Sequence, residues 1–392
     1  MRLPFIAQIG VGFLLAVAVN SLGQVVPQAE TPRQTAMALE QQGKNAEAEA
    51  AWRLYAKAHP SNPEPYAHMG LLEARQEHYH EAIALYRKAL ELDPAMPSLR
   101  LNLGLAYFKA EEMQEAIKVF LPLYKSLPAA SPERQRLAIL LGMANYGRAA
   151  YAEAVPFLKE AAAADPQNLP LRLSLAHSCL WSKQFQCVLD TYREILQLNA
   201  ESAEADMLAG EAQDELKDHA GAIEQFRAAV RANPNEPDVH FGLGYLLWTQ
   251  RHYEEAVSEF HAELANNPHH SQAMLYLGDA EMQLSHREAA QALLEKVTQT
   301  APDLSLGHLD LGILYAEESR NEDALREMQR SVQLDPENVN GHWRLGRLYL
   351  VMGKKDAGKL ELEKAHSITK ATDDALINKM NGASHTTNGT VQ

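Results

Sequence analysis

The chain has few of the residues on which catalysis, cross-linking or nucleic-acid binding commonly depends. Its 392 residues include two cysteines and 7% aromatic residues, and its formal net charge is −15. Because nucleic acids and anionic membranes attract clusters of Lys and Arg, an acidic chain without such clusters disfavours both as partners. No P-loop, Gly-x-Ser-x-Gly or His-Glu-x-x-His motif occurs. We therefore expect no catalytic residues and no cofactor.

Histidine is plentiful by comparison, with 16 residues that include the adjacent His269 and His270 and the aligned His308 and His342. Zinc needs its ligands about 2.0–2.1 Å from one ion. Equivalent positions on neighbouring helices lie roughly 8–10 Å apart at the helix axes, so alignment alone does not make a site. We therefore expect no metal site.

A largely apolar segment at the N-terminus differs from the rest of the chain. Arg2 supplies a positive charge, residues 5–19 are mostly apolar, and small residues at 21 and 23 suit the −3 and −1 positions of a cleavage site. This pattern is typical of a signal peptide over residues 1–23, followed by a linker at 24–31. An uncleaved membrane anchor is the alternative, because about 18 mostly apolar residues come near the lower limit for a span. We expect an exported protein, periplasmic or secreted.

The rest of the chain carries small residues at a nearly fixed spacing. Eight of the nine intervals between them are 34 residues, and one is 38. These residues are Ala36, Gly70, Gly104, Gly142, Ala176, Gly210, Gly244, Gly278, Gly312 and Gly346. A second small residue follows twelve positions later in most repeats, and a proline twelve after that. A period of this length indicates an array in which each repeat contacts chiefly its neighbours.

Within one repeat the apolar spacing predicts two amphipathic helices. In residues 97–130, Leu103, Gly104 and Tyr107 mark the first helix, and Ala116 and Phe120 mark the second. Glycine inside a helix costs roughly 0.5–1 kcal/mol against alanine, so its repetition implies close contact where the helices cross. The trailing proline ends the second helix because it cannot donate an i→i−4 hydrogen bond.

The pattern Leu-Gly-x-x-Tyr, then Ala, then Phe or Tyr, then Ala, then Asp-Pro resembles the tetratricopeptide repeat. Residues 66–94 and 309–336 show it well. The resemblance implies an all-α, right-handed superhelical α-solenoid of about ten antiparallel helix pairs. The repeats are expected at 29–62, 63–96, 97–130, 135–168, 169–202, 203–236, 237–270, 271–304, 305–338 and 339–368.

Several irregularities interrupt this period. Residues 131–134 are expected to lengthen one loop between repeats. The fifth repeat is the least regular, and it carries Trp181. Residues 367–380 predict a polar capping helix, which solenoids require at an exposed end. The small, polar residues 381–392 predict a disordered tail.

Two cysteines, Cys179 and Cys187, lie in the fifth repeat. In an oxidising compartment a disulfide could join its two helices. The alternative is a pair of buried, inert thiols. The narrow range of Cα separations that a disulfide allows favours the thiols at this stage.

A second stripe on each first helix, at positions two, five, nine and twelve, is polar in some repeats and apolar in others. In tetratricopeptide arrays this stripe lines a concave groove that binds extended peptides or helices. The expected groove residues are Leu101, Leu105, Phe108, Met143, Tyr146, Glu211, Asp214, Phe241, Tyr245, Trp248 and Trp343, together with Trp181 of the fifth repeat. Exposed aromatic patches commonly mark interaction sites. The alternative is that these side chains pack one repeat on the next.

These features predict a non-catalytic scaffold or adaptor that binds other proteins, in cell-envelope assembly or secretion. One alternative is a periplasmic, chaperone-like subunit that holds an exported client. A second is a regulatory repeat module of an envelope polysaccharide or glycosyl-transfer system. No nucleic-acid partner is expected, and membrane contact is expected only through an uncleaved N-terminal segment.

Overall fold

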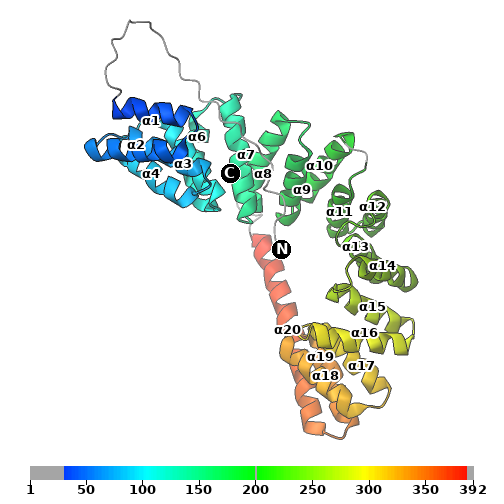
Figure 1. Ribbon diagram of the computed structural model, residues 1–392. Coiled ribbons are helices and arrows are strands. Elements are labelled where there is room, and N and C mark those ends of the chain that lie inside the picture. The colour runs from blue at the N-terminus through cyan, green and yellow to red at the C-terminus, as the bar shows by residue number, and fades with distance from the viewer. Residues whose placement is uncertain (1–30, 199–200, 386–392) are drawn as a thin grey trace. The chain divides into compact units, whose positions relative to one another are not determined.

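A computed structural model describes residues 31–198 and 201–385, and every regular element in these ranges is a helix (Figure 1). The expected signal peptide and all but the last residue of the expected linker lie outside the described residues. The chain divides into two compact units, Met1–Ser126 and Leu127–Gln392. None of the described helices is both long and apolar enough to span a membrane.

Twenty helices in the described ranges form ten consecutive antiparallel pairs, which confirms the predicted α-solenoid. The first unit contains α1 (Pro32–Gln41), α2 (Asn45–Ala58), α3 (Glu64–Arg75), α4 (Tyr79–Leu92), α5 (Pro97–Lys109) and α6 (Met113–Ser126). The second unit contains α7 (Pro132–Gly147), α8 (Tyr151–Ala164), α9 (Leu169–Trp181), α10 (Phe185–Leu198), α11 (Ala203–Glu215), α12 (His219–Ala232), α13 (Val239–Thr249), α14 (Tyr253–Asn266), α15 (Ser271–Gln283), α16 (Arg287–Thr300), α17 (Ser305–Glu317), α18 (Asn321–Leu334), α19 (Val339–Val351) and α20 (Lys355–His385).

The turn inside each pair uses one left-handed residue at position 15 of the repeat. Gly43 and Gly353 hold this position in the first and last repeats, with φ of 71° and 76°. Non-glycine residues hold it in between, for example Lys183 at 59° and Ser319 at 62°. A left-handed residue lets the chain leave a helix while the last carbonyls still accept hydrogen bonds. The repeat therefore fixes the hairpin turn by backbone conformation as well as by composition.

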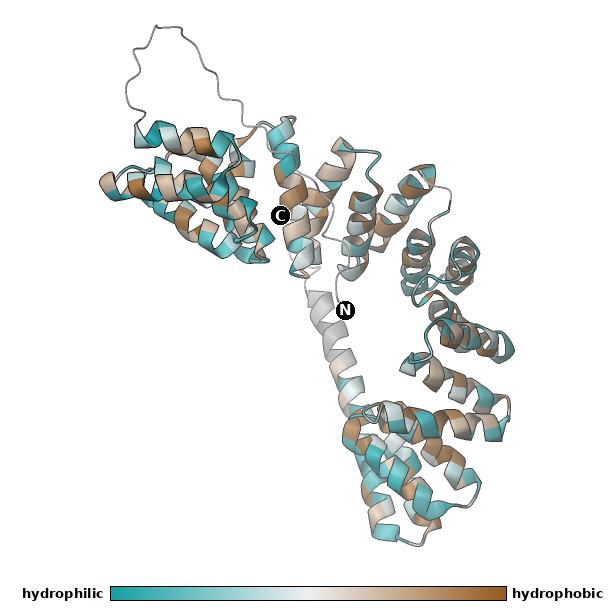
Figure 2. Cartoon of the chain, in the orientation of Figure 1, coloured by the Kyte–Doolittle hydropathy of each residue, from teal (hydrophilic) through white to brown (hydrophobic). Residues whose placement is uncertain are grey.

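Close packing of the two helices explains the regular spacing of small residues, as the sequence predicted. A Cβ atom on Gly104 would lie 2.4 Å from the ring of Phe120, and one on Gly244 would lie 2.8 Å from the ring of Phe260. Both rings are fully buried and belong to the second helix of the same repeat. Figure 2 shows hydrophobic and hydrophilic residues interleaved along the helices. In the eight repeats with glycine at this position, the first helix thus receives a large side chain from its partner helix where glycine leaves room.

A buried His–Glu pair joins the two helices in three of the repeats. The histidine at position 4 of the repeat, on the first helix, contributes Nδ1. The glutamate at position 23, on the second helix, contributes a carboxylate oxygen. The pairs are His240–Glu259 at 2.6 Å, His308–Glu327 at 2.7 Å and His342–Glu361 at 2.5 Å. In the last two pairs Nε2 also lies 3.2 and 3.0 Å from the carbonyl oxygens of Pro302 and Pro336, which come before the repeat. These histidines therefore link both helices to the preceding turn.

Three expectations about the irregular segments are wrong. Residues 132–134 do not lengthen a loop but form the first turn of α7, with the Ser131 hydroxyl accepting from the Arg134 N–H at 3.3 Å. Residues 367–380 are not a separate capping helix, because α20 continues without a break from Lys355 to His385. The helix also takes up residues 381–385, where a disordered tail was expected, and residues 386–392 lie outside the described part. In both places the additional residues continue the adjacent helix.

Candidate interaction surface

The first helices of successive repeats lie side by side in the second unit. Contacts join α11 to α13, α13 to α15, α15 to α17, and α17 to α19. Figure 1 shows these helices following one another along the unit, each beside its own second helix. Residues at one register position on successive first helices therefore form a continuous inner face, on which most of the predicted groove residues of this unit lie.

Four aromatic side chains, which we call the aromatic patch, meet on this inner face. Phe241, Tyr245 and Trp248 come from α13, and Tyr276 comes from α15. The Tyr276 ring centroid lies 5.1 Å from that of Tyr245, 5.0 Å from that of Trp248 and 6.1 Å from that of Phe241. Tyr245 remains 36% exposed, and the other three are half-buried. The patch thus packs one repeat on the next and still presents a surface to solvent.

A carboxylate fixes the orientation of one ring in the patch. Trp248 Nε1 donates to Asp279 Oδ2 at 2.5 Å, across the contact between α13 and α15. Burial raises the pKa of the Tyr276 hydroxyl, and the nearby Tyr245, Asp279 and Asp310 raise it further. The Tyr276 hydroxyl is therefore neutral and lies near the carboxyl groups of Asp279 and Asp310.

Two acidic residues of the sixth repeat, Asp214 and Glu211, differ in whether another side chain of the protein pairs with them. Asp214 Oδ1 lies 2.7 Å from His219 Nδ1, so this carboxylate is paired with an imidazole. Glu211 has no hydrogen bond or ion pair with any described residue, and it is exposed to water. Burial by surrounding protein atoms nevertheless raises its pKa, with His177 opposing and Asp238 adding to the rise. Of the two carboxylates, that of Glu211 is therefore the one that the described residues leave unpaired.

The remaining predicted residues do not join this patch. Leu101, Leu105 and Phe108 lie on α5 of the first unit, where Leu101 is exposed and the other two are half-buried. Met143 and Tyr146 on α7 are half-buried in the second unit.

Two tryptophans predicted for the groove are among the most exposed aromatic side chains of the described chain. Trp181 at the end of α9 is 62% exposed and stacks on Tyr151 at 6.2 Å between ring centroids. The guanidinium of Arg347 lies over Trp343 on α19, 4.7 Å from the centroid of the tryptophan ring. Tyr151 also contacts Tyr146, with 5.7 Å between their ring centroids, so it links two of the predicted residues, Tyr146 and Trp181. The other predicted residues outside the aromatic patch do not join either group.

Sequence reasoning missed three residues of the inner face, Tyr276, Asp279 and Asp310. Tyr276 and Asp310 occupy position six, which the predicted stripe skipped. Asp310 is 5% exposed, and its Oδ2 atom is buried without a hydrogen-bond partner. Burial raises its pKa well above the usual value, with Asp279 adding to the rise and Arg344 opposing it. An aspartate inside an otherwise apolar helix, as in the run Leu309–Leu311, was the signal that could have found it.

Asp238, Glu263 and His270 bring three metal-type ligand atoms within 4.8 Å of one another. The His270 ring already caps α15, because its Nδ1 accepts the Ala273 N–H at 3.1 Å. That contact leaves the proton on Nε2, which lies 3.0 Å from Asp238 Oδ1. A metal at Nε2 would require the proton on Nδ1, where it would meet the Ala273 N–H. These contacts form a hydrogen-bonded link between the seventh and eighth repeats.

Cys179 and Cys187 form a disulfide between α9 and α10. Their Cα atoms are 5.8 Å apart, which is within the range that a disulfide spans. The interpretation favoured from the sequence, two free thiols, therefore differs from the structure. Spacing along the chain could not decide between them, because the Cα distance depends on how closely the helices pack.

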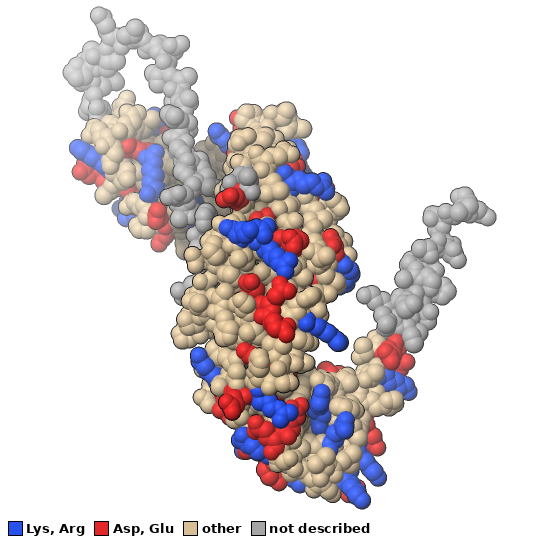
Figure 3. All heavy atoms as spheres, turned by 90° about the vertical axis from the view of Figure 1, so that its right-hand side faces the viewer, with Lys and Arg blue, Asp and Glu red and all other residues tan. Residues whose placement is uncertain are grey.

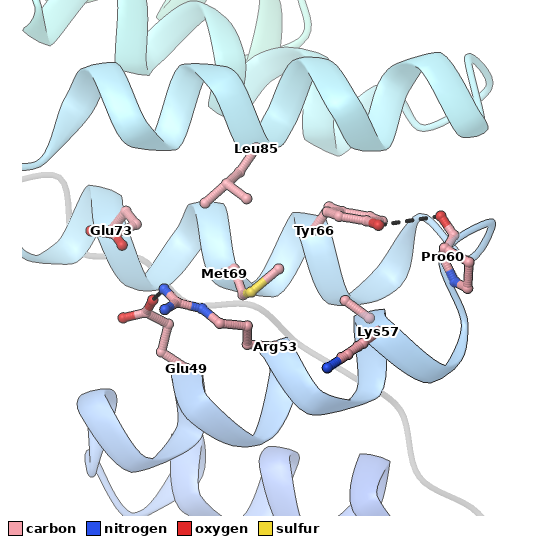
Figure 4. A pocket seen from close by; sticks show the side chains of 9 residues that line it. Glu49, Arg53, Lys57, Pro60, Tyr66, Met69, Glu73 and Leu85 are labelled. Carbon is pink, nitrogen blue, oxygen red and sulfur yellow. Dashed lines mark hydrogen bonds and ion pairs between the residues drawn. The ribbon is translucent and has the colours of Figure 1, made fainter.

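A shallow groove of about 530 Å³ lies in the first unit between α2, α3 and α4 (Figure 4). Met69 and Leu85 form its apolar wall, and Arg53 pairs with Glu49 along its edge. The Tyr66 hydroxyl donates to the Pro60 carbonyl at 3.3 Å. Its polar groups are thus largely paired within the groove, and none of the predicted binding residues lines it.

Surface charge on the second helices is mixed. Figure 3 shows Lys and Arg interspersed with Asp and Glu over the face that it draws. An example is Arg227, which lies 2.9 Å from Glu224 and 2.8 Å from Glu255. Exposed pairs of this kind add little stability.

Family models identify the repeats. A TPR repeat model matches residues 70–110, and a tetratricopeptide repeat model matches residues 189–237, 241–305 and 309–362. The chain belongs to the tetratricopeptide repeat family. Proteins built from this repeat are typically non-catalytic, and we describe this tetratricopeptide-repeat chain as a protein–protein interaction scaffold.

Solved structures show similar folds. MamA from Desulfovibrio magneticus RS-1 is 22% identical, with 44% of this chain and 97% of that chain covered and a TM-score of 0.40. YrrB, described as a TPR protein with an unusual peptide-binding site, is 17% identical, with coverages of 48% and 97% and a TM-score of 0.39. The Naa15/Naa10 complex bound to HypK-THB is 18% identical, with coverages of 86% and 63% and a TM-score of 0.45. A comparison with curated protein sequences returns no match.

Proposed function

We propose that the inner face of the second unit binds an extended peptide or a helix of a partner protein, with the aromatic patch as its apolar anchor. The observation that supports this most is the partly exposed cluster of Phe241, Tyr245, Trp248 and Tyr276. Aromatic side chains supply large contact areas at little entropic cost and dominate binding energy at many interfaces. The partner therefore presents apolar side chains to this patch.

Charge beside the patch favours a basic residue in the partner. Glu211 lies on α11, which contacts α13 of the patch, and it is exposed to water without a partner among the described residues. Burial raises the pKa of its carboxyl group, so a nearby positive charge would stabilise the ionised form. A Lys or Arg of the partner supplies that charge, and an acidic partner would be repelled.

We further propose that this scaffold is exported and takes part in cell-envelope assembly or secretion. The charged and apolar pattern of residues 1–23 supports export. A chaperone-like subunit that holds an exported client would use the same surface. A regulatory module of a polysaccharide system would bind a glycan or an enzyme instead, and its purified chain would retain glycan.

The test is cross-linking capture of partners from an envelope fraction with the wild type and Tyr245→Ala. Tyr245 is the most exposed ring of the patch, so its loss should remove contact area while the packing of Phe241 and Trp248 is kept. Leu54→Ala is the matched control, because Leu54 is exposed on α2 in the other unit.

Captured protein that is lost with Tyr245→Ala and kept with Leu54→Ala supports the proposal. Equal capture by both variants, with helicity retained, contradicts it. Glu211→Gln should weaken capture and reduce its dependence on salt, because one attractive charge is removed. Capture of no protein together with glycan binding would favour the polysaccharide module.

A further inference from the structure

The fifth repeat has a cation at the position where other repeats have a His–Glu pair. Position 4 is Arg172, and position 23, which is Glu in the seventh, ninth and tenth repeats, is Thr191. The Thr191 hydroxyl donates to the Cys187 carbonyl at 2.8 Å, within its own helix. The second helix of this repeat therefore offers no carboxylate at the place where one faces position 4 elsewhere.

Arg172 is buried without full compensation. It is 7% exposed, and its Nε and Nη1 atoms are buried without a hydrogen-bond acceptor. Glu194, one turn beyond Thr191, places Oε2 3.2 Å from Nε but not in hydrogen-bonding geometry. A buried guanidinium that lacks acceptors is costly, because its N–H groups lose water without gaining partners.

A cavity of about 780 Å³ lies against this arginine. Helices α8, α9 and α10 and the turn before α9 enclose it, and they lie next to one another in Figure 1. Lys159, Gln167 and Gln197 contribute polar groups to its wall. Ala162, Leu175 and Leu198 contribute apolar surface. The cavity therefore combines one buried cation with space for a small apolar body.

We propose that this cavity binds the carboxylate of a ligand with a small apolar body, and that Arg172 receives the carboxylate. The ligand would supply the group that Glu259, Glu327 and Glu361 supply in their own repeats. A planar carboxylate matches the fork of a guanidinium. A dianionic phosphate fits less well, because Asp190 and Glu194 also line the cavity.

This site is independent of the inner face. Its wall comes mainly from second helices, and none of the aromatic patch residues lines it. A free organic acid and the C-terminus of a peptide carry the same chemistry, so the probes must separate these sources.

The experiment titrates the purified chain with N-acetyl-leucine and with a short peptide that ends in leucine, each as free carboxylate and as C-terminal amide. NMR shifts or calorimetry report binding. The free carboxylates should bind and the amides should bind about tenfold or more weakly, because a charge-assisted contact is lost. Binding of the peptide alone identifies a chain terminus as the ligand, and binding of both identifies a general carboxylate receptor. Equal affinity for acid and amide, or no binding of either acid, overturns the proposal.

Two variants assign the site. Thr191→Glu places a carboxylate at position 23, as in the seventh, ninth and tenth repeats, and should abolish binding without lowering the melting temperature. Arg172→Gln should also abolish binding, and Thr191→Glu still decides the outcome if that variant does not fold. Lys183→Gln is the matched control, because Lys183 is an exposed cation of the same repeat that does not line the cavity. Binding that survives in a folded Thr191→Glu variant contradicts the assignment to Arg172.

Discussion

The fifth and ninth repeats share one backbone plan and are held together differently. Both close their hairpin with a left-handed residue at position 15, Lys183 in one and Ser319 in the other. The ninth repeat joins its helices through the buried His308–Glu327 pair, whereas the fifth has a disulfide and has no carboxylate at position 23, so that Arg172 has only Glu194 nearby, outside hydrogen-bonding geometry. Small and large apolar residues therefore specify the repeat, and the polar positions between its helices are free to diverge.

The largest expected effect comes from breaking the polar link of the ninth repeat. His308→Leu leaves Glu327 without its imidazole partner and leaves the Pro302 carbonyl with only the long contact from Arg330 at 3.5 Å. Removal of one partner of a buried pair is strongly destabilising, so we expect a loss of about 3 kcal/mol in the free energy of unfolding. Urea unfolding followed by circular dichroism measures it.

The eighth repeat provides the control for this prediction. It has Met274 and Leu293 at positions 4 and 23, so the same fold accepts an apolar pair. The double variant His308→Met with Glu327→Leu should recover most of the lost stability, because it leaves no charge unpaired. A double variant as unstable as His308→Leu would show that the link to Pro302, rather than the ion pair, holds this repeat.

Loss of the disulfide is the matching test in the fifth repeat. A bridge between residues eight apart restricts the unfolded chain, and the chain-entropy estimate for such a loop is about 2–3 kcal/mol. Cys179→Ser with Cys187→Ser should lower unfolding stability by that amount under oxidising conditions. Dithiothreitol should lower the stability of the wild type to that of the variant and leave the variant unchanged. A wild type that ignores the reductant would contradict a structural role for the bridge.

The sequence was sufficient to predict the repeat because its determinants are local and periodic. Gly104 and Phe120 are 16 residues apart, and every pair of this kind recurs at the same spacing. The positions of the proposed binding surface were harder to predict. Phe241, Tyr245 and Trp248 were found from their stripe, but Tyr276 and Asp310 were missed because their exposure depends on how the next repeat packs.

Asp310 tests whether a buried acid in the ninth repeat costs stability. Its folded-state pKa lies above its unfolded value, so the folded state binds more protons and stability falls as the pH rises above about 4. Asp310→Asn removes this charge at similar volume and should raise unfolding stability at pH 7 by about 1–2 kcal/mol. The gain should vanish at pH 3, where both side chains are neutral. A variant less stable than the wild type at pH 7 would mean that Arg344 pairs with Asp310 in solution.

Glu211 should show the same sign with a smaller effect, because water still reaches it. Folding also raises the pKa of Glu211. Ionisation of Glu211 therefore lowers the stability of the folded state at pH values above its unfolded-state pKa, and this loss of stability disappears as the pH falls. Glu211→Gln should therefore raise the melting temperature slightly at pH 7 and not at pH 3, whereas Asp214→Asn should lower it at pH 7 by breaking the pair with His219. Thermal unfolding at the two pH values distinguishes them. Equal effects of the two variants would mean that Glu211 is paired like Asp214, and the inner face would then lack the free carboxylate that favours a basic partner.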